Sequence, residues 1–510
     1  MTNGDTNPPG GESPGRTGER SAPIDLPAEE FRAAGYALID RLTEVLRGIR
    51  ERPVTGGLAV GDIRRLIDAD APMPDEGAPA GELLAEAAEV LTRHSLYNGH
   101  PRFLGYVTSS PAPIGMLADL LAAAVNPNVG AWTLSPVASE IEAQTIRWIA
   151  GLLGFPAGCS GLLVSGGNVA NHVGIYTALR SVFPRDSGGL PPERLGRATV
   201  YATVETHTWI EKAMDMFGFA PGARRSVGVD AAQRLDVDDL RARLAADVRA
   251  GLLPVAVVGN AGTVSTGAVD PLPAIAAVCR EHGVWFHVDG AYGGFAAMLA
   301  DASEDLRGLS LADSVAVDPH KWLYTPLEAG CALVRDPVRH RAAYSYHPPY
   351  YHFDEEATNY VDYGPQNSRG FRALKVWLGL RQAGRRGCAG MIAEDIALAR
   401  RLSERLQRER CYRVFTHNLS IVTFQYVPEG CLDQVGQPAT EAYLNRLNQA
   451  LQERLETSGE LFVSNAVIDG RHALRACIVN FRTSASDIDA IPGIISRHGD
   501  RLHATLDRQP

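Results

Sequence analysis

Short apolar runs alternate with helical periods through the middle of the chain. The runs cover residues 161–165, 198–204, 255–259, 284–288, 314–317 and 331–334. Helix candidates lie between them, such as 137–153, which follows Ser135-Pro136 and precedes Gly154, the usual signals for the two ends of a helix. This alternation predicts an α/β domain with a mostly parallel sheet over residues 96–385.

The patterns on either side of this region differ from it. Apolar residues recur at helical spacing over 26–49 and over 82–94, which predicts a helical segment within residues 23–95. We expect this segment to pack on another subunit or on the large domain, because it is too small for a core of its own. Helices near 391–408 and 441–455, strands near 419–427 and 473–480, and a closing helix predict a smaller α+β domain over 386–510. Residues 1–22 are almost free of apolar side chains, and we expect a disordered tail there.

Composition and charge exclude several classes of function. The chain has 49 Lys and Arg against 59 Asp and Glu, a net charge of −10, and therefore offers no broad basic surface for nucleic acid. Its most apolar windows run about ten residues, short of the ~20 that span a bilayer, and its first residues lack the apolar core of a secretory signal. Its seven cysteines show no C-x-x-C spacing, which argues against disulfides and a metal site. We expect a cytoplasmic enzyme.

Chemistry-bearing residues follow the apolar runs directly. Lys321, in Asp318-Pro319-His320-Lys321-Trp322, comes just after run 314–317, and Asp289 directly follows run 284–288. Ligands of open α/β sheets bind at the carboxyl ends of the strands. Taken alone, the lysine could be a solvated surface residue and the aspartate a helix cap.

A glycine turn and a histidine follow two other runs. Ser165-Gly166-Gly167-Asn168 lies between a predicted strand and a predicted helix, where free backbone N–H groups can bind an anion. His207 comes just past run 198–204 and could stack on a flat ligand, although an isolated histidine is more often structural. An anion cradle, a carboxylate and an amine on successive strand ends are what pyridoxal 5'-phosphate (PLP) requires for its phosphate, pyridine nitrogen and aldehyde.

The motifs together resemble those of the group II PLP-dependent amino acid decarboxylases, the family of aromatic-L-amino-acid, histidine and glutamate decarboxylases. The resemblance runs from about residue 31 into the C-terminal domain. It is carried by His100-Pro101-Arg102-Phe103, Ser135-Pro136, Ser165-Gly166-Gly167, His207, Gly262-Thr263, His287-Val288-Asp289-Gly290-Ala291-Tyr292 and Asp318-Pro319-His320-Lys321-Trp322. It implies the aspartate-aminotransferase-like fold, called fold type I.

The resemblance also implies roles for single residues. It makes Lys321 the Schiff-base lysine, Asp289 the partner of the pyridine nitrogen and His207 the stacking residue. The other cofactor neighbours that it implies are Gly166, Gly167 and Asn168 on the phosphate turn, with Asp318 close by, Ala291 beneath the ring, and Thr263 and His320. Asn168 departs from the hydroxyl residue that relatives commonly carry, but its amide can still donate a hydrogen bond.

The tyrosine-rich segment 344–352 resembles the mobile catalytic loop of the family. Pro348-Pro349-Tyr350 fits the loop's Pro-x-Tyr pattern, which implies that Tyr350 returns the proton after carbon dioxide leaves. Tyr351 or Tyr346 could hold this role instead, and such a stretch can also be surface packing. A tyrosine at this position argues against an aldehyde synthase, and the retained Lys321 and Asp289 argue against a non-catalytic scaffold.

The resemblance also places the substrate side chain. It would lie near Tyr106 and Ser109, and near residues 128–132 of the partner subunit, which include Asn128 and Trp132. The expected assembly is a homodimer with active sites shared across the interface. An aromatic or related L-amino acid is the leading substrate, decarboxylated to its amine. Oxidative deamination to an aldehyde, or another PLP lyase reaction, remains the alternative.

Overall fold

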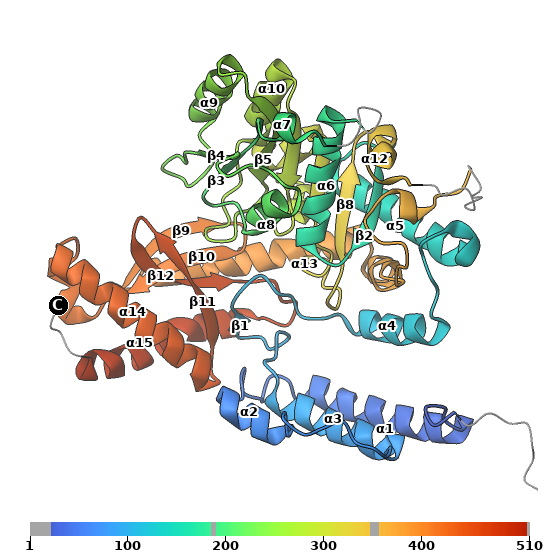
Figure 1. The fold of residues 1–510 in the computed structure, drawn as a ribbon. Coiled ribbons are helices and arrows are strands. Elements are labelled where there is room, and N and C mark those ends of the chain that lie inside the picture. Colours follow the sequence, from blue (N-terminus) through green and yellow to red (C-terminus); the bar gives the residue numbers. More distant parts are fainter. Residues whose placement is uncertain (1–21, 185–189, 347–355, 507–510) are drawn as a thin grey trace, which may run out of the picture. The chain divides into compact units, whose positions relative to one another are not determined.

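The computed structural model describes residues 22–184, 190–346 and 356–506, and these form two compact units (Figure 1). Residues 22–51 and 58–95 make up the first unit, and residues 52–57 and 96–506 the second. The helices of the first unit are α1 (Ala28–Arg47), α2 (Val60–Leu66) and α3 (Ala80–His94). Only Val45, Ile49 and Ala88 are buried apolar residues among the described part of this unit, although both long helices are amphipathic.

The second unit contains a seven-stranded sheet with the order β2-β8-β7-β6-β5-β3-β4. Its strands are β2 (Ser160–Val164), β3 (Ala198–Thr203), β4 (Arg224–Val227), β5 (Leu253–Asn260), β6 (Trp285–Asp289), β7 (Ser314–Val317) and β8 (Gly330–Val334). The pairs from β4 to β7 are parallel, whereas β8 runs antiparallel to both of its neighbours. The predicted mostly parallel sheet is therefore confirmed, and all of the predicted runs are strands.

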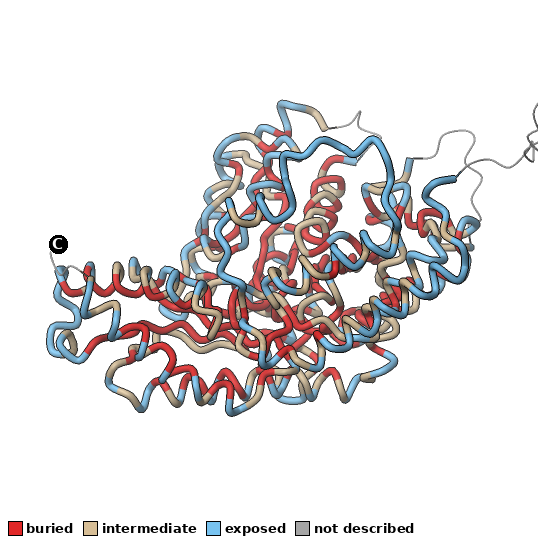
Figure 2. The backbone as a smooth tube through the Cα atoms, turned by 90° about the horizontal axis from the view of Figure 1, so that it is seen from below, coloured by how far each residue is buried: buried red, intermediate tan, exposed pale blue. Residues whose placement is uncertain are grey.

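Helices cover both faces of this sheet. Those of the large domain are α4 (Pro113–Val125), α5 (Pro136–Leu153), α6 (Gly167–Val182), α7 (Pro192–Leu195), α8 (Trp209–Met216), α9 (Val237–Arg249), α10 (Leu272–His282), α11 (Glu304–Arg307), α12 (Pro337–Tyr344) and α13 (Ala373–Gln407). One buried apolar cluster lies under α6 and α8, and a larger one joins α5, α9, α10 and α13 to the sheet. Figure 2 shows the buried backbone concentrated in the strands and in the inner faces of the helices.

The C-terminal part is built on a second sheet with the order β1-β11-β12-β10-β9. Its elements are β1 (Phe103–Leu104), β9 (Tyr412–Asn418), β10 (Ile421–Tyr426), β11 (Phe462–Ile468), β12 (Arg471–Cys477), α14 (Pro438–Ser458) and α15 (Ala485–Thr505). Helix α13 contacts α4 and α5 of the large domain as well as β9 and α15, and Gly384, at φ 65°, interrupts its helical geometry. Within the described residues, none of the helices has the length and apolar character that crossing a membrane requires.

Candidate active site

A cavity of about 360 Å³ lies at the carboxyl ends of β2, β3, β5, β6 and β7. Strand ends of an open α/β sheet converge at one edge, so residues far apart in sequence meet there. All the residues expected to contact a cofactor line this cavity: Gly166, Gly167, Asn168, His207, Thr263, Asp289, Ala291, Asp318, His320 and Lys321. Glu205, Trp209 and Glu328 also line it, and the sequence analysis did not single them out.

An ion pair holds the lysine of this cavity. Lys321 Nζ lies 2.9 Å from Asp318 Oδ2, and His320 Nε2 lies 3.6 Å from the same oxygen. The other oxygen, Asp318 Oδ1, is buried and has no hydrogen-bond partner. Burial lowers the pKa of His320, so its imidazole is neutral at pH 7. The pair therefore leaves a primary amine and a buried acceptor facing the cavity.

The glycine turn forms a backbone cradle beside this pair. Gly166 has φ +89°, a conformation open to glycine but strained for other residues. A Cβ at Gly167 would lie 2.6 Å from Asp318 Oδ2, so a side chain there would collide with the carboxylate. The first backbone N–H groups of α6 precede its internal hydrogen bonds and can donate to an anion.

A chain of buried hydrogen bonds fixes this turn. Ser314 Oγ accepts from Trp285 Nε1 at 2.8 Å and lies 2.8 Å from His287 Nδ1. On the other side of the imidazole, His287 Nε2 lies 2.7 Å from Asn171 Oδ1, and Asn171 Nδ2 donates to the Gly167 carbonyl. Burial lowers the pKa of His287 to about 4, so the ring is neutral and this network assigns its proton to Nε2. No strand-end pattern marks these residues in the sequence.

Asp289 and His207 share one neighbour. The Asp289 carboxylate accepts from the Ala291 backbone N–H at 3.1 Å through Oδ1. Its Oδ2 accepts from the Trp209 indole N–H at 2.6 Å, and the Trp209 backbone N–H donates to His207 Nδ1 at 3.2 Å. Burial lowers the pKa of His207, although the Asp289 charge opposes that shift. His207 is thus a neutral, oriented imidazole.

The segment after Lys321 is held by Asp395 on α13. Asp395 Oδ2 accepts hydrogen bonds from Trp322 Nε1 at 3.0 Å and from the Tyr324 hydroxyl at 2.7 Å. Burial raises the pKa of Asp395 to about 7. This carboxyl therefore holds the two aromatic residues that follow the lysine.

The residues expected to contact a substrate side chain do not line the cavity. Ser109 Oγ donates to the His320 carbonyl at 2.7 Å, which ties its segment to the lysine loop, and Tyr106 is exposed beside Phe462. Asn128 Oδ1 accepts from the backbone N–H groups of Gly130 and Arg369. The Trp132 indole N–H donates to Glu140. Tyr350 and Tyr351 lie outside the described residues.

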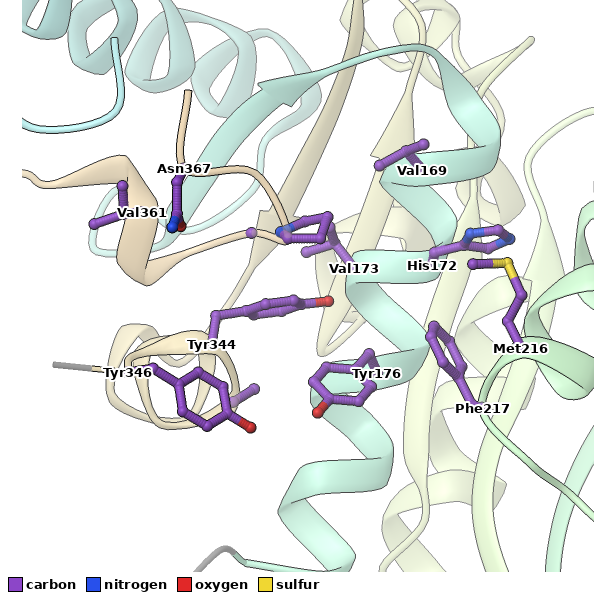
Figure 3. A pocket seen from close by; sticks show the side chains of 13 residues that line it. Val169, His172, Val173, Tyr176, Met216, Phe217, Tyr344, Tyr346, Val361 and Asn367 are labelled. Atoms are coloured by element: carbon purple, nitrogen blue, oxygen red, sulfur yellow. The ribbon is translucent and has the colours of Figure 1, made fainter. Parts of the chain in front are cut away.

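A larger, mostly apolar cavity of about 610 Å³ lies along α6. Figure 3 shows Tyr176 and Phe217 on one side and Tyr344 and Tyr346 on the other. His172 also lines it, with Nε2 3.3 Å from the Trp209 carbonyl, and burial lowers the pKa of this imidazole. Among the described residues that line this cavity, none carries an amine or a carboxylate, so the smaller cavity is the candidate active site.

The smaller cavity fits PLP in its chemistry. It combines a glycine cradle that a Cβ would fill, an orphaned buried acceptor in Asp318, an amine and a second carboxylate in Asp289. Across the described ranges, no group of three or more histidine, cysteine, aspartate or glutamate side chains could hold a metal ion.

Comparison with known proteins agrees with this chemistry. Residues 61–427 match the model of the pyridoxal-dependent decarboxylase conserved domain. An aromatic-L-amino-acid decarboxylase of Bacillus atrophaeus is 30% identical over 470 residues, covering 91% of this chain and 94% of that protein. A phenylacetaldehyde synthase of Petunia hybrida is 28% identical, covering 94% of this chain and 96% of that protein. The crystal structure of Oryza sativa TDC with PLP and tryptamine superposes with a TM-score of 0.87 at 27% identity, covering 95% of this chain and all of that chain.

Proposed function

We propose that this chain, which belongs to the pyridoxal-dependent decarboxylase family, converts an aromatic or related L-amino acid into its amine and carbon dioxide. PLP is the cofactor, as the family requires. The observation that carries the proposal is the meeting of Lys321, Asp289, His207 and the glycine turn in one cavity.

The roles proposed for the residues are those that the family resemblance implies, and the geometry of the cavity supports them. The Lys321 amine holds the cofactor aldehyde, and Asp318 Oδ2, 2.9 Å away, balances the ammonium charge before that bond forms. Gly166, Gly167 and Asn168 receive the phosphate at the start of α6. Asp289 keeps the pyridine nitrogen protonated, and His207 stacks on the ring as a neutral imidazole. When bound, PLP accepts the electron pair that the departing carboxylate leaves at the α-carbon.

Proton return at the α-carbon requires an acid, and Tyr350 is the residue we propose for it. The assignment rests on the Pro-Pro-Tyr sequence pattern alone. Tyr346, an alternative, is exposed at the wall of the larger cavity.

The charges of the cavity support a substrate without an acidic side chain. Lys321 is the only lysine or arginine among the described residues that line it, and the cofactor uses that amine. Glu205 and Glu328 add carboxyl groups to the wall. Burial raises the pKa of Glu205, which favours its neutral form, and Glu328 already pairs with Arg372 at 2.7 Å. The described lining therefore offers no free cation for a second carboxylate on the substrate, which favours an aromatic side chain over that of glutamate.

A homodimer is the proposed assembly. Helix α4 and the segment after it expose a row of apolar side chains, namely Leu117, Leu120, Leu121, Val125, Leu134 and Val137. Such a row is typical of a surface covered by another subunit. A cytoplasmic location is proposed on the seven cysteines, all free and most of them buried.

The test is product analysis with purified protein and PLP. L-phenylalanine, L-tyrosine, L-tryptophan, L-histidine and L-glutamate are offered separately in air, and amine, aldehyde, ammonia and carbon dioxide are measured. We expect amine and carbon dioxide in equal amounts from at least one aromatic substrate. Aldehyde and ammonia in place of amine would instead assign the chain the second candidate function, that of an aldehyde synthase. The similarity to phenylacetaldehyde synthases is the reason for testing this candidate.

A further inference from the structure

Trp209, the first residue of α8, bonds to both groups that would flank a cofactor ring. Its indole N–H donates to Asp289 Oδ2 at 2.6 Å, and its backbone N–H donates to His207 Nδ1 at 3.2 Å. The side chain lines the cavity, yet the residue is only 1% exposed. One buried residue therefore connects the carboxylate at one edge of the site with the imidazole.

We propose that Trp209 is a positioning residue for PLP, acting through Asp289 and His207. This inference rests on the proposed function, because it takes Asp289 as the partner of the pyridine nitrogen. The indole touches the carboxylate, and the roles of binding and protonating the ring stay with Asp289.

The hydrogen bonds of Asp289 explain why a donor is needed at this place. Oδ1 already accepts the Ala291 backbone N–H, which fixes one end of the carboxylate. The indole N–H on Oδ2 fixes the other end, so the plane of the carboxylate cannot rotate away from a ring nitrogen. Each oxygen keeps a second lone pair for the cofactor. A donor on a half-buried carboxylate also stabilises its negative charge.

The surroundings of Trp209 hold the indole in this orientation. Its ring meets the buried His287 edge to face, at 5.8 Å between centroids and 80° between planes. His172 Nε2 lies 3.3 Å from the Trp209 carbonyl, on the side of the larger cavity. The donor is thus pre-oriented by packing and does not depend on a ligand to place it.

Two substitutions distinguish the contribution of the indole N–H from that of the ring's packing volume. Trp209→Phe keeps an aromatic ring but removes the donor, whereas Trp209→His keeps a ring N–H at the corresponding ring position and removes the second ring. The matched control is Trp377→Phe, which removes an indole N–H that donates to the neutral Gln144 side chain, away from the cavity. Melting temperatures of the cofactor-free proteins show whether each variant is folded.

The first readout is the affinity of cofactor-free protein for PLP, measured by equilibrium dialysis. A hydrogen bond to a charged group corresponds to a factor of roughly ten or more in an equilibrium constant. We expect Trp209→Phe to bind PLP at least tenfold more weakly, Trp209→His to bind more tightly than Trp209→Phe, and Trp377→Phe to match wild type. The visible circular dichroism of bound PLP, which reports ring orientation, should change in Trp209→Phe only. In the holoenzyme, kcat should fall with KM within about threefold, because ring geometry and not substrate binding is disturbed.

A double-mutant cycle decides whether the indole acts through Asp289. In an Asp289→Asn background, Trp209→Phe should weaken PLP binding by less than about threefold, because the charged acceptor is already gone. Equal weakening in both backgrounds would reduce Trp209 to a packing residue and overturn the inference. A folded Trp209→Phe variant that binds PLP with wild-type affinity and shows the wild-type circular dichroism would also overturn the inference. If wild type itself took up no PLP, the proposed function would fail instead.

Discussion

Lys321 Nζ lies 2.9 Å from Asp318 Oδ2 at the end of β7, and that carboxylate is 2% exposed. A buried carboxylate needs a counter-charge, and a lysine three residues later supplies it. The same pair keeps the amine at the floor of the cavity, close to the glycine turn, where Gly167 leaves room for the carboxylate. A single short loop therefore positions both the Lys321 amine and the carboxylate that balances its charge.

Removing this amine should abolish covalent attachment of PLP. Borohydride reduction of the wild-type holoenzyme is expected to fix PLP to the Lys321 peptide, detected by mass spectrometry, and Lys321→Ala should show no fixed cofactor and lose activity by a factor of roughly 1,000 or more. The chain has only three lysines, and Lys212 on α8 is exposed, so Lys212→Ala is a matched control that should keep both properties. Fixed PLP in Lys321→Ala would refute the assignment.

Asp395 should make the stability of the protein depend on pH. Its folded-state pKa, raised by burial to about 7, lies above the ordinary value of 3.8, so the folded state holds a proton that the unfolded chain releases. This stabilisation is complete below about pH 4 and is lost as pH rises through 7. Between pH 5 and 8 the loss should amount to roughly 2 kcal/mol in the free energy of unfolding.

Asp395→Asn tests this dependence, because an amide oxygen can still accept from Trp322 and Tyr324. Urea unfolding of both proteins at several pH values isolates the contribution of this one carboxyl, since His287 and His340 titrate alike in both. The stability of the variant relative to wild type should rise from pH 5 to pH 8. Parallel curves would contradict the raised pKa.

The functional strand ends could be predicted from the sequence because two kinds of signal coincide there: apolar runs of strand length and residues that can do chemistry. Several apolar runs of strand length are followed within a few residues by Lys321, Asp289, His207 or a glycine turn. Few structures other than an open α/β sheet with a ligand site at its strand ends fit this pattern. The pattern could not give the direction of β8, because an apolar run reads the same in a parallel or an antiparallel pair.

The structural roles of Trp209, His287 and Asp395 were missed for a different reason. Their roles depend on which side chains meet after packing, such as α8 against the end of β6, and no spacing along the chain encodes those meetings. A tryptophan two residues after a candidate histidine carried no signal by itself. The short β4 was missed because its sequence, Arg-Arg-Ser-Val, has little apolar character.

The buried pair Arg369–Glu142 should be critical for stability. The two side chains are 1% and 0% exposed, and Arg369 also donates to the carbonyls of Val129 and Leu163. Arg369→Met leaves the Glu142 charge unpaired inside the protein, which should cost about 3–5 kcal/mol. Arg401→Met is the control, because its pair with Asp489 is 48% and 34% exposed and screened by solvent, so its loss should destabilise the protein far less. Chemical unfolding measures both, and equal effects would show that the buried pair is worth no more than the exposed one.

If Tyr350 reaches the active site of the neighbouring subunit, two inactive variants should complement each other. A hybrid dimer of one Lys321→Ala chain and one Tyr350→Phe chain then has one site with both defects and one site with neither. Random pairing of equal amounts makes half of the dimers hybrid, so amine formation should recover to about one quarter of wild type under two-fold symmetry.

The experiment coexpresses the two chains with different affinity tags and purifies the hybrid through both. In the purified hybrid the expected activity is about half of wild type, because one of two equivalent sites is intact. Doubly tagged Lys321→Ala dimers serve as the control and should stay inactive. A hybrid without amine formation would place Tyr350 in the site of its own subunit, because every site would then carry one defect. A homodimer of Tyr351→Phe chains with wild-type amine formation would leave the role with Tyr350, because Tyr351 would then be dispensable.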